Sequence, residues 1–281
     1  MIELGTNRYG KAAIRVVRVS KGAGGHRLRD LTVAVALEGD FAAAHTDGDN
    51  SLVVATDTMK NTAYAFAKAH LDGPIEAYGR ALSEHFLEFP QVDRVTATVR
   101  EHDWIPIEVA GRPAPDAFVR RSEGTRVATI SSTRGGTTVE AGIEDLIVMK
   151  TGRSAFVGFP RDRYTTLAEA DDRIMATRVT AAWRYGSPDV DADTAFGAIR
   201  ATFLELFADH DSASVQASIW VIARGIIERH EEVDEVRMVM PNLHHWLADL
   251  SRFGLENDGE IWIATTEPHG LIEAVVRRGD D

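Results

Sequence analysis

The sequence contains no cysteine, which removes several kinds of chemistry at once. Without cysteine the chain has no disulfide framework, thiolate nucleophile, iron–sulfur cluster or cysteine-ligated zinc. Long hydrophobic runs are also missing, because none approaches the roughly 18 apolar residues that span a bilayer. We therefore expect a globular protein with no membrane partner.

Positive charge is in deficit as well. The chain has 31 Lys and Arg against 43 Asp and Glu, a formal net charge of −12 with His neutral. A surface that binds nucleic-acid phosphates needs a basic stripe, and the densest basic cluster, Arg120-Arg121, is soon followed by Glu123. The sequence predicts no nucleic-acid partner. It shows neither a signal peptide nor a peroxisomal address, so the expected location is cytoplasmic.

Three common site motifs are incomplete or missing. Gly5 to Lys11 matches a phosphate-binding glycine loop in spacing, but Ala12 stands where Ser or Thr holds magnesium. The ten His show no HExxH spacing, and His244 and His245 are neighbours on an expected strand, so at most one should line any pocket. No Gly-x-Ser-x-Gly elbow is present. We predict no NTPase, no metal site and no serine hydrolase.

Hydrophobic periodicity predicts the same order of elements twice. Alternating apolar residues around a Gly-rich turn predict a hairpin, and apolar spacings of three and four predict two helices after it. Strands then resume, and after Gly135-Gly136 the order begins again. The expected elements are strands over 11–37, helices near 61–70 and 75–89, strands from 92, strands over 137–150 and 178–185, helices around 196–206 and 215–226, and strands over 233–240 and 261–276.

This order predicts an α+β fold with two tandem domains, residues 1–134 and 135–281. Each domain is expected to be an antiparallel four-stranded sheet with two helices on one face. Such sheets leave open edges, and an open edge needs a partner strand or a cover. We therefore expect an oligomer in which sheets of several subunits meet.

Polar residues gather at three places next to apolar strands. Thr56, Asp57 and Thr58 precede the first helix, where an ordinary helix N-cap is the simplest interpretation. Asn242 follows Pro241 in what is otherwise a plain turn, and Arg173 in Asp-Asp-Arg-Ile could form a surface ion pair. Taken singly, none of these predicts a function.

Six separated segments of the chain are informative when they are taken together. They are Tyr9-Gly10-Lys11; Ala55 to Thr58 with Lys60-Asn61; Phe156 to Asp162 with Tyr164 to Leu167; Asp172-Arg173-Ile174; Ser214 to Ala217; and Pro241-Asn242 with His244-His245. These segments occur in the order and approximate spacing found in urate oxidases, and the chain resembles that family over essentially its whole length. Agreement across six segments is far more specific than any one short motif.

The resemblance implies two tunnelling-fold domains per chain, a homotetramer around a central tunnel, and active sites shared between subunits. It implies oxidation of urate by O₂ and water to 5-hydroxyisourate and hydrogen peroxide, with no metal or other cofactor. Such an oxidase is chemically reasonable because the urate anion is itself an electron-rich reductant, so the protein needs only to bind, orient and deprotonate it.

The resemblance also implies roles for individual residues. Lys11, Thr56 and His244 would form a catalytic proton relay. A guanidinium suits an anion and a carboxamide offers both a donor and an acceptor. The substrate-binding residues implied are Arg173 and Gln216 on one edge of the ring, Phe156 stacked on its face, Leu167 on another edge, Asn242 holding O₂ or water, and backbone N–H groups at Thr56, Asp57 and Val215.

Two other functions stay open from the sequence. Other tunnelling-fold enzymes bind pterins, but they anchor the ring with Glu and often use zinc, whereas Arg173 with Gln216 suits an anionic purine better. A non-catalytic purine-binding tetramer would keep Phe156, Arg173 and Gln216 without needing the relay.

Overall fold

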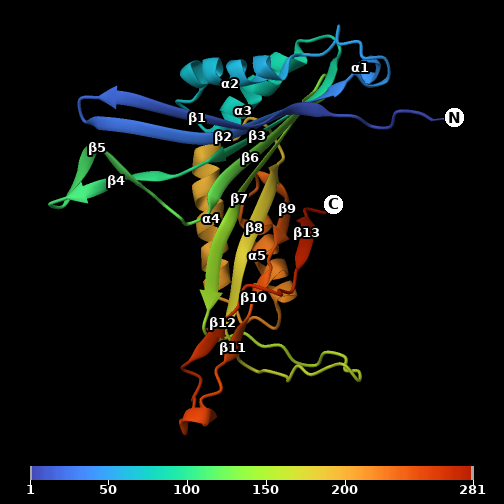
Figure 1. Cartoon of the computed structure of the whole chain (residues 1–281). Coiled ribbons are helices and arrows are strands. Elements are labelled where there is room, and N and C mark those ends of the chain that lie inside the picture. The colour runs from blue at the N-terminus through green and yellow to red at the C-terminus, as the bar shows by residue number, and fades with distance from the viewer. Residues whose placement is uncertain (1, 280–281) are drawn as a thin grey trace. The chain divides into compact units, whose positions relative to one another are not determined.

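The computed structural model describes residues 2–279 (Figure 1). The chain forms two compact units. The first unit comprises the residues up to Gly142 together with Arg184–Ala195, and the second comprises Ile143–Trp183 together with the residues from Phe196 onwards.

The first unit contains an antiparallel sheet in the order β1 (Tyr9–Gly22), β2 (Gly25–Gly39), β3 (Val92–Glu101) and β6 (Thr125–Thr133). Its buried face has the predicted alternation, because Leu31, Val33, Val35 and Leu37 are buried while the residues between them are partly accessible. The long hairpin predicted over residues 11–37 is thus confirmed by β1 and β2.

Helices α2 (Thr56–His70) and α3 (Ile75–Leu87) belong to this unit and follow a short helix, α1 (Ala42–Thr46). Helix α3 packs on β3 and β6, and the two helices are joined by the buried Tyr78 hydroxyl, which donates to the carbonyl of Ala63 at 2.7 Å. The predicted helix near residues 61–70 therefore begins earlier, at Thr56, and the second ends at Leu87.

A further hairpin, β4 (Trp104–Val109) with β5 (Arg112–Arg120), was not predicted. Its side chains are partly or fully exposed, so burial imposes no alternating pattern, and prolines interrupt both strands. The Trp104 indole N–H anchors the start of the hairpin by donating to Asp30 at 3.0 Å.

The second unit contains most of the strands β7 (Gly136–Lys150) and β8 (Met175–Tyr185), followed in the sheet order by β9 (Val233–Val239) and β13 (Glu273–Arg277). Strand β10 (Asn242–Leu243) also pairs with β8. Helices α4 (Ala192–Ala208) and α5 (Val215–Arg229) lie between β8 and β9 in the chain. The element order of strands, two helices and strands thus occurs twice, in agreement with the predicted α+β class. No helix within residues 2–279 is both long and apolar enough to cross a membrane.

The prediction of strands over residues 261–276 is confirmed only at the two ends of that range. The chain instead forms β12 (Trp262–Ala264), which pairs with β11 (His245–Leu247), and then β13 on the edge of the main sheet. Pro268 and Gly270 lie between them, and these residues disfavour a continuous strand because proline lacks an N–H and glycine is flexible. A one-turn 3-10 helix, η1 (Ser251–Phe253), lies in the β11–β12 connection.

Candidate active site

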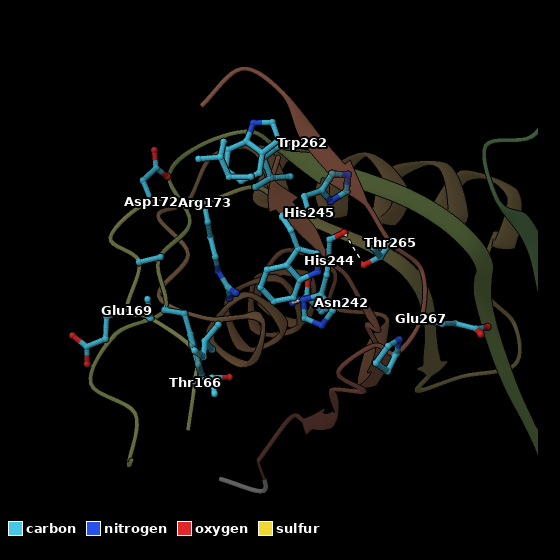
Figure 2. Close-up of a pocket in the computed structure, with 18 residues that line it drawn as sticks. Thr166, Glu169, Asp172, Arg173, Asn242, His244, His245, Trp262, Thr265 and Glu267 are labelled. Atoms are coloured by element: carbon cyan, nitrogen blue, oxygen red, sulfur yellow. Dashed lines mark hydrogen bonds between the residues drawn. The ribbon is translucent and has the colours of Figure 1, made fainter. Parts of the chain in front are cut away.

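A cavity of about 1060 Å³ opens in the second unit between the β7–β8 connection and the residues around β10 to β12. Five residues predicted for the site line it (Figure 2). They are Phe156, Leu167, Arg173, Asn242 and His244. The structure thus brings together most of the predicted substrate-binding set that lies in this unit.

Arg173 supplies the positive charge of this pocket. Its side chain is partly buried, and burial lowers the pKa of its guanidinium. Among residues 2–279, Arg173 forms no ion pair. Its Nε atom is buried and has no hydrogen-bond partner among these residues. A surface ion pair, the simplest interpretation of its sequence context, is therefore not what the structure shows. An arginine desolvated without a carboxylate is poised to bind an external anion.

Phe156 lies next to Arg173. The Arg173 Cζ is 5.2 Å from the centroid of the Phe156 ring, and Phe159 stacks on the same ring at 4.9 Å. The backbone of Phe156 is fixed by two hydrogen bonds with Ala170, at 2.8 and 3.2 Å. The Ser154 N–H donates to the Asp172 carboxylate at 3.1 Å, which ties the segment before Phe156 to the residue before Arg173.

Asn242 and His244 form the opposite wall. Asn242 is 8% exposed, and its backbone pairs with Thr177 of β8 and with Gly270. Its amide nitrogen is 3.4 Å from His244 Nδ1. Figure 2 shows the Arg173 side chain pointing toward the side of the pocket that holds these two residues, whereas the carboxylates of Asp172 and Glu169 point away from it.

The His244 ring is held by its surroundings. It stacks on Trp246 at 5.3 Å, and its carbonyl accepts the Thr265 N–H at 2.8 Å. The pKa of His244 lies below its ordinary value, first because of burial and then because of the positive charges of Arg173, His269 and His245. A neutral imidazole at neutral pH is able to accept a proton.

The expectation that only one of His244 and His245 lines a given pocket is wrong, because both line this one. The chain leaves β10 at Leu243 and enters β11 at His245, so His244 lies between two strands and the alternation of a single strand does not apply.

Val215 and Gln216 are not among the residues lining this pocket; they begin helix α5. The N-cap is Ser214, whose hydroxyl accepts the Ala217 N–H at 3.1 Å. The N–H groups of Val215 and Gln216 have no acceptor within the helix, because a helix leaves its first four N–H groups free.

Lys11, Thr56 and Asp57 lie in the first unit. Asp57 accepts hydrogen bonds from Lys60 and from Asn61, the latter at 3.0 Å. The pKa of Asp57 is lowered mainly by Lys60, and the charge of Lys11 also lowers it, which places Lys11 near the start of α2.

The N-cap interpretation of Thr56 to Thr58 is wrong. The N-cap is Ala55, which has no capping side chain, and Thr56, Asp57 and Thr58 lie in the first turn of α2. Their backbone N–H groups are therefore available to a ligand.

Sequence reasoning missed several residues around these sites. Trp246, Trp262 and Thr265 line the pocket, although no spacing in the sequence connects them to it. Tyr9 is part of a matched motif, and its hydroxyl accepts the Val54 N–H at 2.8 Å and donates to the Val54 carbonyl at 3.1 Å. These bonds hold the segment before Thr56 against β1. Among residues 2–279 no three His, Asp or Glu are grouped so that they could hold a metal ion.

Comparison with known proteins decides the family. The family model described as Uricase matches residues 7–131 and 139–273. The chain is 42% identical over 280 residues to a uricase of Arthrobacter globiformis, covering 99% of this chain and 90% of the relative. The chain belongs to the uricase family. It is also 40% identical over 282 residues to a uricase of Dictyostelium discoideum, covering 99% of this chain and 98% of the relative.

Solved uricase structures agree with this assignment. The crystal structure of the Arthrobacter globiformis uricase aligns with a TM-score of 0.93, covering 100% of this chain and 96% of that one. A urate oxidase of Bacillus sp. TB-90 aligns at 0.82 with 23% identity, covering 97% of this chain and 99% of that one, and supports the fold alone. The prediction of an α+β protein with tandem tunnelling-fold domains is confirmed.

For a uricase, the division of residues between the two units is informative. Phe156, Leu167, Arg173, Asn242 and His244 line one pocket of the second unit, whereas Lys11, Thr56 and Asp57 belong to the first. The proposed anchor and most of the proposed relay are therefore carried by different units.

Proposed function

We propose that this uricase-family chain oxidises urate with O₂ and water to 5-hydroxyisourate and hydrogen peroxide. Urate loses two electrons and gains one hydroxyl at C5, O₂ takes up the two electrons and two protons, and water supplies the oxygen of the hydroxyl. The observation that best supports this proposal is the environment of Arg173. Its guanidinium is partly buried, forms no ion pair with any of residues 2–279, and lies over the Phe156 ring. This arrangement suits a flat anion.

In this proposal, Arg173 and Gln216 bind one edge of the urate ring, Phe156 stacks on its face and Leu167 packs on another edge. Backbone N–H groups of Thr56, Asp57 and Val215 bind the remaining ring acceptors. Asn242 holds O₂ or the water that replaces it. Its 8% exposure and its position beside His244 support this role.

Lys11, Thr56 and His244 are proposed as the proton relay. A Thr hydroxyl is a poor base alone, but it can pass a proton between a neighbouring amine and a bound water. A His244 whose pKa is lowered is neutral near pH 7 and can accept that proton. No metal or organic cofactor takes part in this proposal, because urate supplies the electrons.

We further propose a homotetramer whose active sites join the relay of one subunit to the anchor of another, in a cytoplasmic setting. The presence of these two residue sets in different units of the chain supports this arrangement.

The test is a direct assay after dialysis against a strong chelator. We expect the urate absorbance band to disappear with uptake of one O₂ and release of one hydrogen peroxide per urate. Restoration of the rate only by copper, iron or flavin would refute cofactor-free oxidation. Binding of urate without turnover would favour the non-catalytic purine-binding tetramer instead.

A further inference from the structure

Three buried polar side chains in the second unit have no part in the proposed reaction. His210, Ser212 and Ser218 are 8%, 2% and 0% exposed, and they lie in and just after the connection from α4 to α5. Ser212 Oγ is 2.8 Å from Ser218 Oγ, which is 2.8 Å from His210 Nε2. On the other side of the ring, His210 Nδ1 is 2.7 Å from the Leu206 carbonyl.

The acceptors fix the direction of this chain of hydrogen bonds. A carbonyl only accepts, so His210 Nδ1 carries the proton and donates to Leu206. In a neutral ring Nε2 must then accept, so the Ser218 hydroxyl donates to His210 Nε2 and its oxygen accepts a hydrogen bond from the Ser212 hydroxyl. Burial lowers the pKa of His210, as does the charge of Lys150, so the neutral ring that this order requires is the favoured form.

Lys150 holds the backbone of the same residue. Its Nζ donates to the His210 carbonyl, and its side chain is itself buried. The start of the α4–α5 connection is thus fixed at both the main chain and the ring of His210.

The backbone of Ser212 connects the hydrogen-bond network to the segment before Phe156. Its N–H donates to the Arg153 carbonyl at 2.9 Å, and its carbonyl accepts the Ala155 N–H at 2.7 Å. Phe156 is the next residue after Ala155.

Ser218 connects the hydrogen-bond network to the start of helix α5. Its N–H donates to the Ser214 carbonyl at 3.0 Å, and its Oγ lies 3.2 Å from the same carbonyl oxygen. Ser214 is the N-cap of the helix that begins with Val215 and Gln216. The network therefore lies between the proposed stacking residue and the proposed amide anchor, which come from separate segments.

We propose that His210, Ser212 and Ser218 are positioning residues for urate binding, because they fix the Phe156 segment relative to the N-terminus of α5 that presents Gln216. This inference rests on the proposed function for its ligand. Its structural part, the coupling of the two segments, does not depend on the ligand.

The test is the variant Ser218→Ala, which removes one oxygen and leaves the helix sequence otherwise intact. The probe is 9-methylurate, an unreactive urate analogue. We expect its Kd and the KM for urate to rise about 3- to 10-fold, the range set by one net hydrogen bond, with kcat changed less than about twofold. Amide hydrogen exchange at Ala155 and Ala217 should quicken by a similar factor.

The chain offers two controls. Ser154 is 1% exposed in the same region, and its Oγ has no hydrogen-bond partner in the described part of the chain, so Ser154→Ala removes an equally buried hydroxyl outside the network. Ser83 lies in α3 of the first unit, and its Oγ is 2.7 Å from Ser132 Oγ. Ser83→Ala therefore removes a comparable buried hydrogen bond away from the pocket. Both variants should bind the analogue as the wild type does.

Equal affinity and equal exchange in Ser218→Ala and wild type would overturn the inference. So would an affinity loss in Ser154→Ala as large as that in Ser218→Ala, because loosened packing would then be the cause. Failure of the wild-type chain to bind 9-methylurate would refute the proposed function instead. In that case, faster amide hydrogen exchange at Ala155 in Ser218→Ala, but not in the two control variants, would still support the coupling of the two segments. Unchanged exchange at Ala155 in Ser218→Ala would refute it.

Discussion

Arg173 resolves an electrostatic conflict at the scale of a single residue. A net charge of −12 repels an anionic substrate at long range. Within the pocket, the Arg173 guanidinium is partly buried, and charges interact more strongly there than in water. The carboxylates of Asp172 and Glu169, two acidic residues that line the pocket, point away from it, so they do not pair with the Arg173 charge (Figure 2).

Arg173→Ala and Thr56→Ala should therefore fail in different ways. Loss of a charge-assisted bond costs about 2–5 kcal/mol when its partner stays desolvated, so Arg173→Ala should raise KM strongly. Loss of a proton-transfer group costs about 10²–10⁴ in rate, so Thr56→Ala should lower kcat and largely keep analogue binding. Titration of both variants with 9-methylurate measures the difference.

Arg161→Ala is the matched control for this comparison. The Arg161 guanidinium lies 5.6 Å from the Phe159 ring, in the same connection, but Arg161 does not line the pocket. The Arg161→Ala variant should therefore keep a KM for urate close to that of the wild type. If Thr56→Ala loses as much analogue affinity as Arg173→Ala, the separation of relay from anchor is wrong.

The pH dependence of kcat should report His244. The pKa of this group is lowered from 6.5, first by burial and then by positive neighbours, so the neutral, proton-accepting form persists below pH 6.5. Activity should be retained as the pH falls to 6.5 and should be lost only below it, as His244 becomes protonated. His269→Ala removes one of the positive neighbours and should move the acid limb to higher pH. An acid limb above 6.5 in the wild type would contradict the assignment.

At the scale of elements, the beginning of β1 positions Lys11 because the strand approaches β2 closely there. A Cβ on Gly10 would lie 2.0 Å from the Val35 carbonyl oxygen, so only glycine fits there. The register of β1 on β2 then shifts between Lys11 and Ile14, and Ala13 in this bulge has a φ of 56°. Glycine and bulge together fix the direction of the Lys11 side chain.

Gly10→Ala should therefore lower kcat at least tenfold by displacing Lys11, an effect of the order expected for a disturbed proton relay. Overpacking should also reduce the free energy of unfolding by about 1–3 kcal/mol. Gly24→Ala is the control, because a Cβ on Gly24 meets nothing within 4 Å. Steady-state kinetics and denaturant unfolding of both variants measure the two effects. Full activity in folded Gly10→Ala would show that Lys11 needs no such placement.

The sequence predicted the elements whose packing imposes a period. Leu31, Val33, Val35 and Leu37 alternate because one face of β2 is buried, and this alternation was recognisable. The β4–β5 hairpin was missed because its exposed side chains carry no such period.

The candidate site shows the same limit. Arg173, Asn242 and His244 were identified through matched motifs, and the structure places them in one pocket. Trp246 and Trp262 were missed because they reach the pocket through the β11–β12 pairing, which no local spacing reveals. His244 and His245 both line the pocket because the strand is interrupted at His244, between β10 and β11.

At the scale of the whole molecule, exposed strand residues favour assembly. In the first unit, Val17 and Val19 of the edge strand β1 are 59% and 48% exposed, and Val109 and Val119 of the β4–β5 hairpin are also exposed. Apolar side chains along an open edge call for a partner surface, and closed symmetry is the usual solution. The proposed tetramer would cover these edges.

Shared active sites then predict complementation between two inactive variants. Lys11→Ala lacks the relay amine and Arg173→Ala lacks the anchor, yet each keeps the residue that the other has lost. If a site takes Lys11 from one subunit and Arg173 from another, random mixing of equal amounts gives about one intact site in four. Unfolding the two proteins together and refolding them should recover about a quarter of wild-type activity.

The control is the same mixing without unfolding, which should recover little activity as long as subunits do not exchange. The double variant Lys11→Ala/Arg173→Ala, refolded with wild type, sets the scale, because about one site in four is then intact by the same counting. Hybrid tetramers are verified by native mass spectrometry of differently tagged subunits. If hybrids form and the two single variants recover nothing, each site takes Lys11 and Arg173 from the same subunit, and the proposed sharing is wrong.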